Sequence, residues 1–182
     1  APFYIFPDGT TILLDAGEMD PTSERVNSAR NASLHPNARK RAHEWIVEYI
    51  KRFHPQASEL MIDYAVITHF HDDHFGSFYA GAKKSSFGNY FLSGITGVGE
   101  YLKFRKLLDR GYPDYNYPVA LKSDSIRAAM MKDASGAKAY QALENYWGFT
   151  EFHVNKSGMI AEKFIAGTDR QIILTKKPGE FK

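Results

Sequence analysis

Three imidazoles and two carboxylates lie within six consecutive residues of this chain, His69-Phe70-His71-Asp72-Asp73-His74. The whole sequence has only seven histidines in 182 residues, so chance would rarely produce such a cluster. Deprotonated imidazole nitrogens and carboxylate oxygens are ligands for zinc and for other transition-metal ions. A loop at this place can turn its first two histidines toward one ion and its last two side chains toward another. The cluster therefore predicts a site for two adjacent metal ions.

The composition limits both the chemistry and the class of protein. There is no cysteine, which excludes disulfides and thiolate ligands and leaves His, Asp and Glu to bind any metal. Hydrophobic residues make up 43% of the chain and charged residues 24%, as in soluble globular proteins, and we expect residues 1–182 to form a single domain. The net charge of +2 is too small to indicate a nucleic-acid or membrane surface. No apolar run reaches the roughly 20 residues that span a bilayer, so we expect no transmembrane segment.

Two features bear on the compartment in which the protein works. The chain begins at Ala1 rather than Met, so we expect that an upstream segment, such as a signal peptide, has been removed. The absence of cysteine suits an exported protein that avoids mispaired thiols. Together these features slightly favour an extracytoplasmic location.

The elements that must position the cluster can be predicted on either side of it. Two short apolar runs, residues 3–6 and 11–14, flank the turn sequence Pro7-Asp8-Gly9 and predict a β-hairpin. The second run ends on Asp15-Ala16-Gly17, which places a carboxylate at the end of a strand. Residues 61–68 predict a buried strand that leads directly into the cluster. Gly76 and the residues after it predict the start of a short helix at 77–80, so we expect the cluster on a strand-to-helix loop.

The remaining elements are predicted from spacing and from breaker residues. Residues 18–37 are polar and contain two prolines, which predicts a long surface loop. Residues 42–53 have apolar side chains at steps of three and four, which predicts an amphipathic helix that ends before a proline. Strand, helix and strand in succession indicate an α/β fold. Beyond the cluster we expect four further elements: a helix at 100–110, an irregular loop at 111–118, a helix at 134–146, and a hairpin of residues 158–166 and 171–175.

The stretch from Val66 to Gly76 resembles the signature motif of the metallo-β-lactamase superfamily, in which the pattern His-any-His-any-Asp-His follows a strand. Members of that family also have an Asp-any-Gly motif at an earlier strand end, which Asp15-Ala16-Gly17 reproduces, and a long helix between the two motifs. The resemblance is best over roughly residues 1–80. It implies the αββα sandwich of that family, of which this chain would hold the N-terminal half plus an insertion. Residues 6–17 look most like hydrolase domains related to the DNA-uptake competence protein, which implies a phosphodiester substrate.

The resemblance also implies a role for each residue of the site. His69 and His71 would bind a first zinc ion, Asp73 and His74 would bind a second, and Asp15 would orient the cluster without binding either ion. Two ions about 3.5–4 Å apart hold a hydroxide whose pKa is lowered toward neutrality, and this hydroxide is the nucleophile. Asp73 is also the expected catalytic residue, since a carboxylate there can accept or return a proton. Iron and manganese are alternatives to zinc.

The family completes its site with ligands from later motifs, namely a further His, an Asp that bridges the ions and a final His. After the cluster this sequence has a single histidine, His153, whose setting differs from that of the family's third ligand. We expect it to be an ordinary strand or surface histidine. The chain is therefore predicted to be truncated at its C-terminal side, with the remaining ligands beyond Lys182. His35, His43 and His54 lack metal spacing and are expected to have structural roles.

The function predicted from these features is a dinuclear zinc hydrolase that uses a bridging hydroxide on an ester, an amide or a phosphodiester, so the partner is a small-molecule or phosphodiester substrate. The alternative is a non-catalytic metal-binding or interaction module whose site is incomplete. A third reading is a redox member of the same fold that binds iron. Neither a nucleophile elbow nor a glycine-rich phosphate loop is present to indicate other chemistry.

Overall fold

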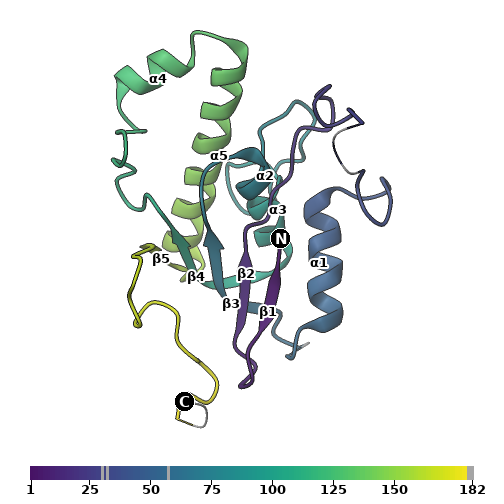
Figure 1. Cartoon of the computed structure of the whole chain (residues 1–182), viewed down its shortest axis with the longest axis vertical. Coiled ribbons are helices and arrows are strands. Elements are labelled where there is room, and N and C mark those ends of the chain that lie inside the picture. Colours follow the sequence, from purple (N-terminus) through teal and green to yellow (C-terminus); the bar gives the residue numbers. More distant parts are fainter. Residues whose placement is uncertain (30, 32, 57, 180–182) are drawn as a thin grey trace.

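A five-stranded mixed sheet forms the centre of the protein, with its strands in the order β1-β2-β3-β4-β5. The computed structural model describes residues 1–29, 31, 33–56 and 58–179. β1 pairs antiparallel with β2, and every other neighbouring pair is parallel (Figure 1). The strands are β1 (Phe3–Ile5), β2 (Thr11–Leu14), β3 (Met61–Ile67), β4 (Lys103–Asp109) and β5 (Ile160–Lys163). The predicted α/β class is confirmed.

The N-terminal hairpin is confirmed, and its turn follows from residue chemistry. The Asp8 carboxylate accepts hydrogen bonds from the Thr10 amide, at 2.8 Å, and from the Thr10 hydroxyl, at 2.7 Å. Gly9 has a φ of 87°, which glycine adopts without steric cost. The turn therefore reverses the chain and aligns Phe3 with Leu13 in the register of the first two strands.

In the described residues five helices accompany the sheet, and one of them ends where the sequence predicts. They are α1 (Ala42–Phe53), α2 (Asp72–Phe75), α3 (Ile95–Tyr101), α4 (Asp124–Met130) and α5 (Ala134–Lys156). α1 matches its predicted range because its apolar spacing buries Val47 and Ile50, and because the chain leaves the helix at His54, before Pro55. The loop predicted at residues 18–37 forms no helix or strand where it is described, and Arg30 and Ala32 lie outside the described residues.

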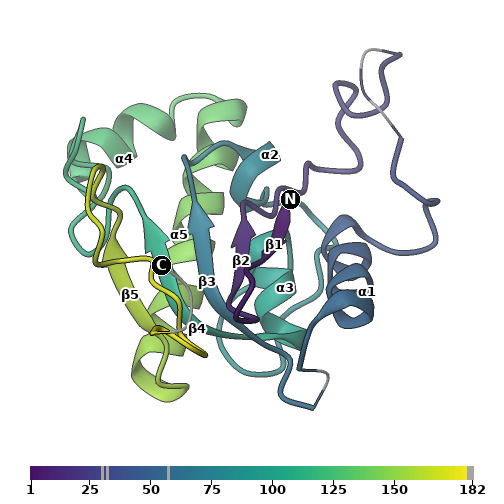
Figure 2. The same cartoon turned by 60° about the horizontal axis from the view of Figure 1, so that its bottom comes forward.

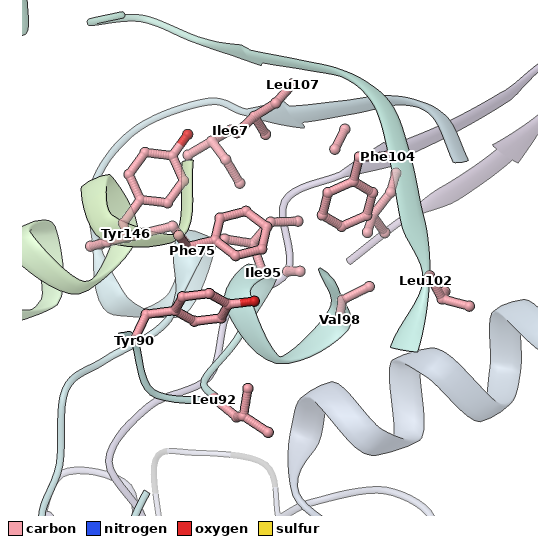
Figure 3. Packing of buried hydrophobic residues seen from close by; sticks show 14 of the residues in the cluster. Ile67, Phe75, Tyr90, Leu92, Ile95, Val98, Leu102, Phe104, Leu107 and Tyr146 are labelled. Atoms are coloured by element: carbon pink, nitrogen blue, oxygen red, sulfur yellow. The ribbon is translucent and has the colours of Figure 1, made fainter. Parts of the chain in front are cut away.

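The main core lies on one face of the sheet. Leu13, Ala65 and Leu107 project from three neighbouring strands into a cluster that also contains side chains of α1, α3 and α5. Figure 2 shows α3 and α5 behind the sheet, on the side away from the C-terminal segment. Figure 3 shows Phe75 of α2 among the side chains of this core, next to Tyr146 of α5. The short helix that carries part of the histidine cluster is thus anchored by an aromatic side chain.

The opposite face of the sheet has a smaller apolar cluster of Ile12, Tyr64, Val66 and Leu108, on which Ile172 packs. The C-terminal segment, residues 171–177, is attached there by hydrogen bonds rather than as a strand. The Tyr64 hydroxyl donates to the Ile173 carbonyl at 3.0 Å and accepts from the Ile173 amide at 3.2 Å. In the described part of the chain this segment, and not a second sheet, covers the face.

Two predictions for the second half of the chain are wrong. Residues 100–110 are not a helix, because α3 ends at Tyr101 and Lys103–Asp109 form strand β4. Phe104, Leu107 and Leu108 have helical spacing, but pairing with β3 on one side and β5 on the other decides the conformation. The hairpin predicted from residues 158–166 and 171–175 does not form either, since β5 pairs parallel with β4 and residues 171–175 form no strand.

Of two other predictions for this half, one is confirmed and one needs adjustment. The irregular loop at residues 111–118 is confirmed. The helix predicted at residues 134–146 exists and continues to Lys156. α4 was not predicted.

Candidate metal centre

The histidine cluster begins where β3 leaves the sheet at its carboxyl end. His69 lies in the connection after the strand, and His71 is the residue immediately before α2. Asp73 and His74 lie within α2, which is a single turn that ends at Gly76 with a φ of 115°. The predicted helix at residues 77–80 does not form, because the helix is earlier and contains half of the cluster. The strand-to-helix connection is confirmed with this shift.

The structure brings the three imidazole rings of the cluster together. The ring centres of His69 and His71 are 4.7 Å apart, at an interplanar angle of 82°. Those of His69 and His74 are 3.7 Å apart, at 48°. His71 and Asp73 are exposed, whereas His69 and His74 are half-buried. Three rings that are predicted to be ligands therefore share one small, solvent-accessible patch.

Asp15 lies directly after β2 and forms hydrogen bonds that orient the imidazoles of this patch. Its amide donates to the Val66 carbonyl at 2.8 Å, and its carboxylate accepts from the Thr68 amide at 2.8 Å. The other carboxylate oxygen is 2.8 Å from Nδ1 of His74. A carboxylate can only accept, so Nδ1 carries a proton, and in the neutral imidazole Nε2 of His74 keeps its lone pair.

Thr68 connects Asp15 to His69 by hydrogen bonds. Its hydroxyl donates its single proton to Asp15 at 2.9 Å, so its oxygen accepts from Nδ1 of His69 at 3.1 Å. Nε2 of His69 is then also left with a lone pair. One carboxylate therefore fixes the orientation of two imidazoles, one directly and one through a threonine hydroxyl.

The fit of this set to a metal can be tested on its donor atoms. Nε2 of His74 and Oδ2 of Asp73 are 3.7 Å apart, close to the separation of about 3.4 Å between two ligands of one tetrahedral zinc. Within residues 1–29, 31, 33–56 and 58–179, however, no three His, Asp or Glu side chains are arranged to hold an ion as they stand. The donor types and the free nitrogens fit zinc, whereas a closed set of ligands is not formed by the described side chains.

The electrostatics of the cluster favour the neutral form of His69. Burial lowers the pKa of this imidazole, and the positive charges that His74 and His71 can carry lower it further. Asp15 and Asp73 raise it, but the lowering effects prevail. Neutral imidazole is the form that binds a metal ion, so less proton competition is expected at His69.

The strand-end motif Asp15-Ala16-Gly17 ends in glycine because the chain leaves no room for a side chain at this position. A Cβ atom at this position would lie 1.8 Å from the Asp73 carbonyl oxygen, a distance that no side chain tolerates. The adjacent Ala16 amide donates to the His74 carbonyl at 2.8 Å, and the Glu18 amide donates to the Asp72 carbonyl at 3.0 Å. The turn after β2 and the turn of α2 are therefore in backbone contact, which positions Asp15 against the histidines.

Glu18 is a buried supporting residue next to the cluster that the sequence reasoning missed. Its buried carboxylate is 2.6 Å from Nδ1 of His43 and accepts from the Arg41 guanidinium at 2.8 Å and from the Tyr79 hydroxyl at 3.1 Å. Burial raises the pKa of the Glu18 carboxyl, but the hydrogen bonds and charge of His43 and the charge of Arg41 outweigh burial and lower it to about 2. Its position directly after Asp15-Ala16-Gly17 was the available signal.

Three of the four histidines outside the cluster, namely His43, His54 and His153, have hydrogen-bond partners, whereas His35 is exposed. His43 pairs with Glu18, and His54 is within 3.0 Å of the Gln56 carbonyl oxygen and 2.9 Å of the Met61 carbonyl oxygen. His153 lies in α5 rather than in the expected strand or surface position, and its Nε2 is 2.9 Å from the Tyr90 hydroxyl. The site is therefore limited to the run from His69 to His74 and the residues that support it.

Cavities lie on both sides of the metal loop, which we define as residues 68–76. One has a volume of about 390 Å³ and lies between the metal loop and α5, with His71 and Asp72 in its wall. The other, of about 920 Å³, lies under the loop after β2 and has Gly17 and Asp73 in its wall. The cluster is thus accessible from two directions.

Comparison of the chain with protein-family models, with curated proteins and with solved structures gave no match. The resemblance to metallo-β-lactamases therefore rests on the two motifs quoted above. In the described residues no helix is long and apolar enough to cross a membrane.

Proposed function

We propose that this chain carries the metal-binding part of a dinuclear zinc hydrolase of the metallo-β-lactamase type, on one αβ half of an αββα sandwich. The observation that carries the proposal is the Asp15-Thr68 network, which leaves Nε2 of both His69 and His74 free and directed by hydrogen bonds. Structural histidines have no need of such an arrangement next to Asp73 and His71. Helices α1, α3 and α5 all pack on one face of the sheet, as the αβ half of an αββα sandwich requires.

In this proposal His69 and His71 hold a first zinc ion, and Asp73 and His74 hold a second. Zinc at such a site acts as a Lewis acid and makes a hydroxide nucleophile available near neutral pH. Asp73 is exposed and adjacent to His74, so its carboxylate can also take up and return a proton. Asp15 binds neither ion and holds the imidazoles of His69 and His74, by hydrogen bonds, in the tautomers that bind metal. Iron or manganese could replace zinc with the same donor types.

The substrate is an ester, an amide or a phosphodiester, since each has a carbonyl or phosphoryl centre that a hydroxide can attack. The phosphodiester is the class favoured by the sequence of residues 6–17. Four side chains supply two ligands to each ion, so both ions keep positions for water, substrate or further ligands.

The second candidate function is a metal-binding or interaction module without catalysis. The observation that favours it is the lack of a three-ligand arrangement among the described residues. Hydrolysis of bis(p-nitrophenyl) phosphate and p-nitrophenyl acetate by zinc-loaded protein separates the two candidates. Zinc-dependent turnover of either compound supports the hydrolase, and zinc binding without turnover supports the module.

Substitution of His71 tests the metal site itself. We expect His71→Ala to reduce the zinc content of the purified protein sharply, because a ligand is lost from an exposed site with few alternatives. Elemental analysis after equilibration with zinc measures the effect. His35→Ala is the matched control, since His35 is an exposed histidine outside the cluster. Equal zinc content in wild type and His71→Ala would rule out the assignment.

A further inference from the structure

A buried carboxylate lies at the end of the strand beside the one that leads into the metal loop. Asp109 is 1% exposed, is the last residue of β4 and pairs with Ile67, the last residue of β3. Its Oδ1 accepts hydrogen bonds from two backbone amides of the following turn, each at 2.7 Å. Its Oδ2 accepts from the hydroxyls of Tyr115, at 2.9 Å, and of Tyr146, at 2.8 Å. Both oxygens of this carboxylate are therefore held by donors of the chain.

The two tyrosines come from different parts of the chain, and Asp109 joins them. Tyr115 lies in the loop after β4, and Tyr146 lies in α5. Burial raises the pKa of both hydroxyls and the charge of Asp109 raises it further, so both keep their protons and donate. The backbone of Tyr115 has a φ of 54°, a left-handed conformation that bulky residues adopt only where their surroundings hold it. Both rings therefore have fixed positions.

Both tyrosine rings pack on one side chain of the metal loop, Phe70. Its ring centre is 5.8 Å from that of Tyr115 and 5.7 Å from that of Tyr146, and it lies against the main core. The neighbours of Phe70 in the sequence are His69 and His71, whose ring centres are 4.7 Å apart in the metal-ligand cluster. Successive side chains of an extended segment point to opposite sides, and His71 has extended angles, with φ −103° and ψ 151°. The inward position of Phe70 therefore directs the imidazoles on either side of it outward.

We propose that Asp109 is a positioning residue of the metal site. Through the hydroxyls of Tyr115 and Tyr146 it fixes the two rings on which Phe70 packs, and Phe70 sets the direction of the histidines beside it. The inference rests on the proposed function, because those two histidines are the proposed ligands of the first zinc ion. Asp109 is buried and touches neither an ion nor a substrate, so its effect is on the geometry of the ligands.

The test removes the two hydroxyls and keeps the rings. The double variant Tyr115→Phe, Tyr146→Phe retains the aromatic side chains next to Phe70 but loses both hydrogen bonds to Asp109. Zinc affinity is measured on the full chain by competition with a chromophoric chelator, and the visible absorption spectrum is recorded with saturating cobalt(II). We expect the double variant to bind zinc about tenfold more weakly, as for other groups that orient metal ligands. Its cobalt spectrum should change as well, because the spectrum reports ligand geometry, whereas a loss of stability alone leaves the spectrum of the folded, saturated protein unaltered.

Tyr90→Phe is the matched control. Tyr90 is also buried, its hydroxyl is 2.9 Å from Nε2 of His153, and its ring packs on Phe149 and Phe152 of α5. This variant loses a comparable buried hydrogen bond and should keep the zinc affinity and the cobalt spectrum of wild type. A wild-type zinc affinity or a wild-type cobalt spectrum in the double variant, or an equal loss of affinity in Tyr90→Phe, would overturn this inference alone. Absence of zinc from the wild-type protein after equilibration would overturn the proposed function, and this inference with it.

Discussion

Asp15 combines backbone strain with a large share of the polar contacts at the site. Its φ of 54° lies in the left-handed region, which residues other than glycine rarely adopt, although aspartate tolerates it better than most. The strained backbone turns the carboxylate toward Thr68 and His74, where it accepts hydrogen bonds on both oxygens. The contacts stabilise a conformation that the residue alone would avoid, which is common where a side chain must be aimed at a site.

Ser77 leads to a prediction about stability. Its buried hydroxyl is unpaired in the described structure, so replacing it with a methyl hydrogen removes an unfavourable group at little cost in packing. We expect Ser77→Ala to raise the free energy of unfolding by about 1 kcal/mol. Urea unfolding followed by circular dichroism measures this change, with the exposed Ser58→Ala as the control that should leave stability unaltered. A loss of stability in Ser77→Ala would show that the hydroxyl has a partner within the protein.

At the residue scale, the sequence identified the histidine cluster but not the side chains, such as Glu18, that hold the segments around it in place. His69, His71, Asp73 and His74 form a dense run that the sequence makes visible, the resemblance to the family adds Asp15 to it, and the structure places Asp15 beside His74. Glu18 directly follows the strand-end motif, but its role depends on residues far away in the sequence. Glu18 acquires its role from Arg41, His43 and Tyr79, which are 23 to 61 positions away.

At the scale of elements, local sequence patterns predicted α1 and β3 correctly and failed for β4. α1 has one buried face, and its apolar period gives its range correctly. β4 lies inside the sheet between two other strands, so its conformation is determined by pairing with Met61–Ile67 and Ile160–Lys163 rather than by its own sequence. The helical spacing of Phe104, Leu107 and Leu108 was misleading for that reason.

Glu18 joins the loop after β2 to α1 and to the N-terminal end of α3, and this connection should depend on pH. The folded-state pKa of about 2 is below the ordinary value of 4.5, so ionised Glu18 stabilises the fold at every pH above about 4.5. We expect about 3 kcal/mol of stability to be lost as pH falls from about 4.5 to about 2, at roughly 1.4 kcal/mol per pKa unit. Urea unfolding at a series of pH values measures the loss.

The variant Glu18→Gln isolates this contribution from that of other carboxylates. It should be less stable than wild type at pH 7 and should lose less stability on acidification, since it has no proton to take up. Glu59→Gln, at an exposed position, is the matched control and should follow wild type. If Glu18→Gln and wild type lost stability in parallel between pH 5 and pH 2, the ion pairs of Glu18 would not contribute as described.

At the scale of the whole molecule, the two faces of the sheet are covered very differently. Three helices bury one face, whereas a single segment without secondary structure, residues 171–177, covers part of the other. The segment is held by Tyr64 and by the buried carboxylate of Asp63, which accepts from the Thr175 hydroxyl and pairs with Lys176. The sequence predicted a strand here because Gln171 to Thr175 is apolar in part, but the segment contacts the face of the sheet and not its edge.

Loss of the Tyr64 hydroxyl should loosen this segment without unfolding the protein. We expect Tyr64→Phe to remove both hydrogen bonds to Ile173 and to speed tryptic cleavage after Lys176 several-fold, since cleavage requires the segment to open locally. The global free energy of unfolding should change by less than about 1 kcal/mol. Cleavage is followed by mass spectrometry, with Tyr49→Phe on the exposed side of α1 as control. An unchanged cleavage rate would mean that apolar packing alone holds the segment.

The contact between Gly17 and the Asp73 carbonyl has a consequence for protein engineering. The backbones of the strand-end motif and of the histidine run are in contact, so each segment shapes the other. This holds although 51 residues of chain separate Gly17 from His69. Transplanting residues 68–76 alone into another α/β scaffold would leave the helical turn without the surface that shapes it. A successful graft has to carry Asp15-Ala16-Gly17 along with it, together with Glu18, which attaches the loop after β2 to Arg41 and His43.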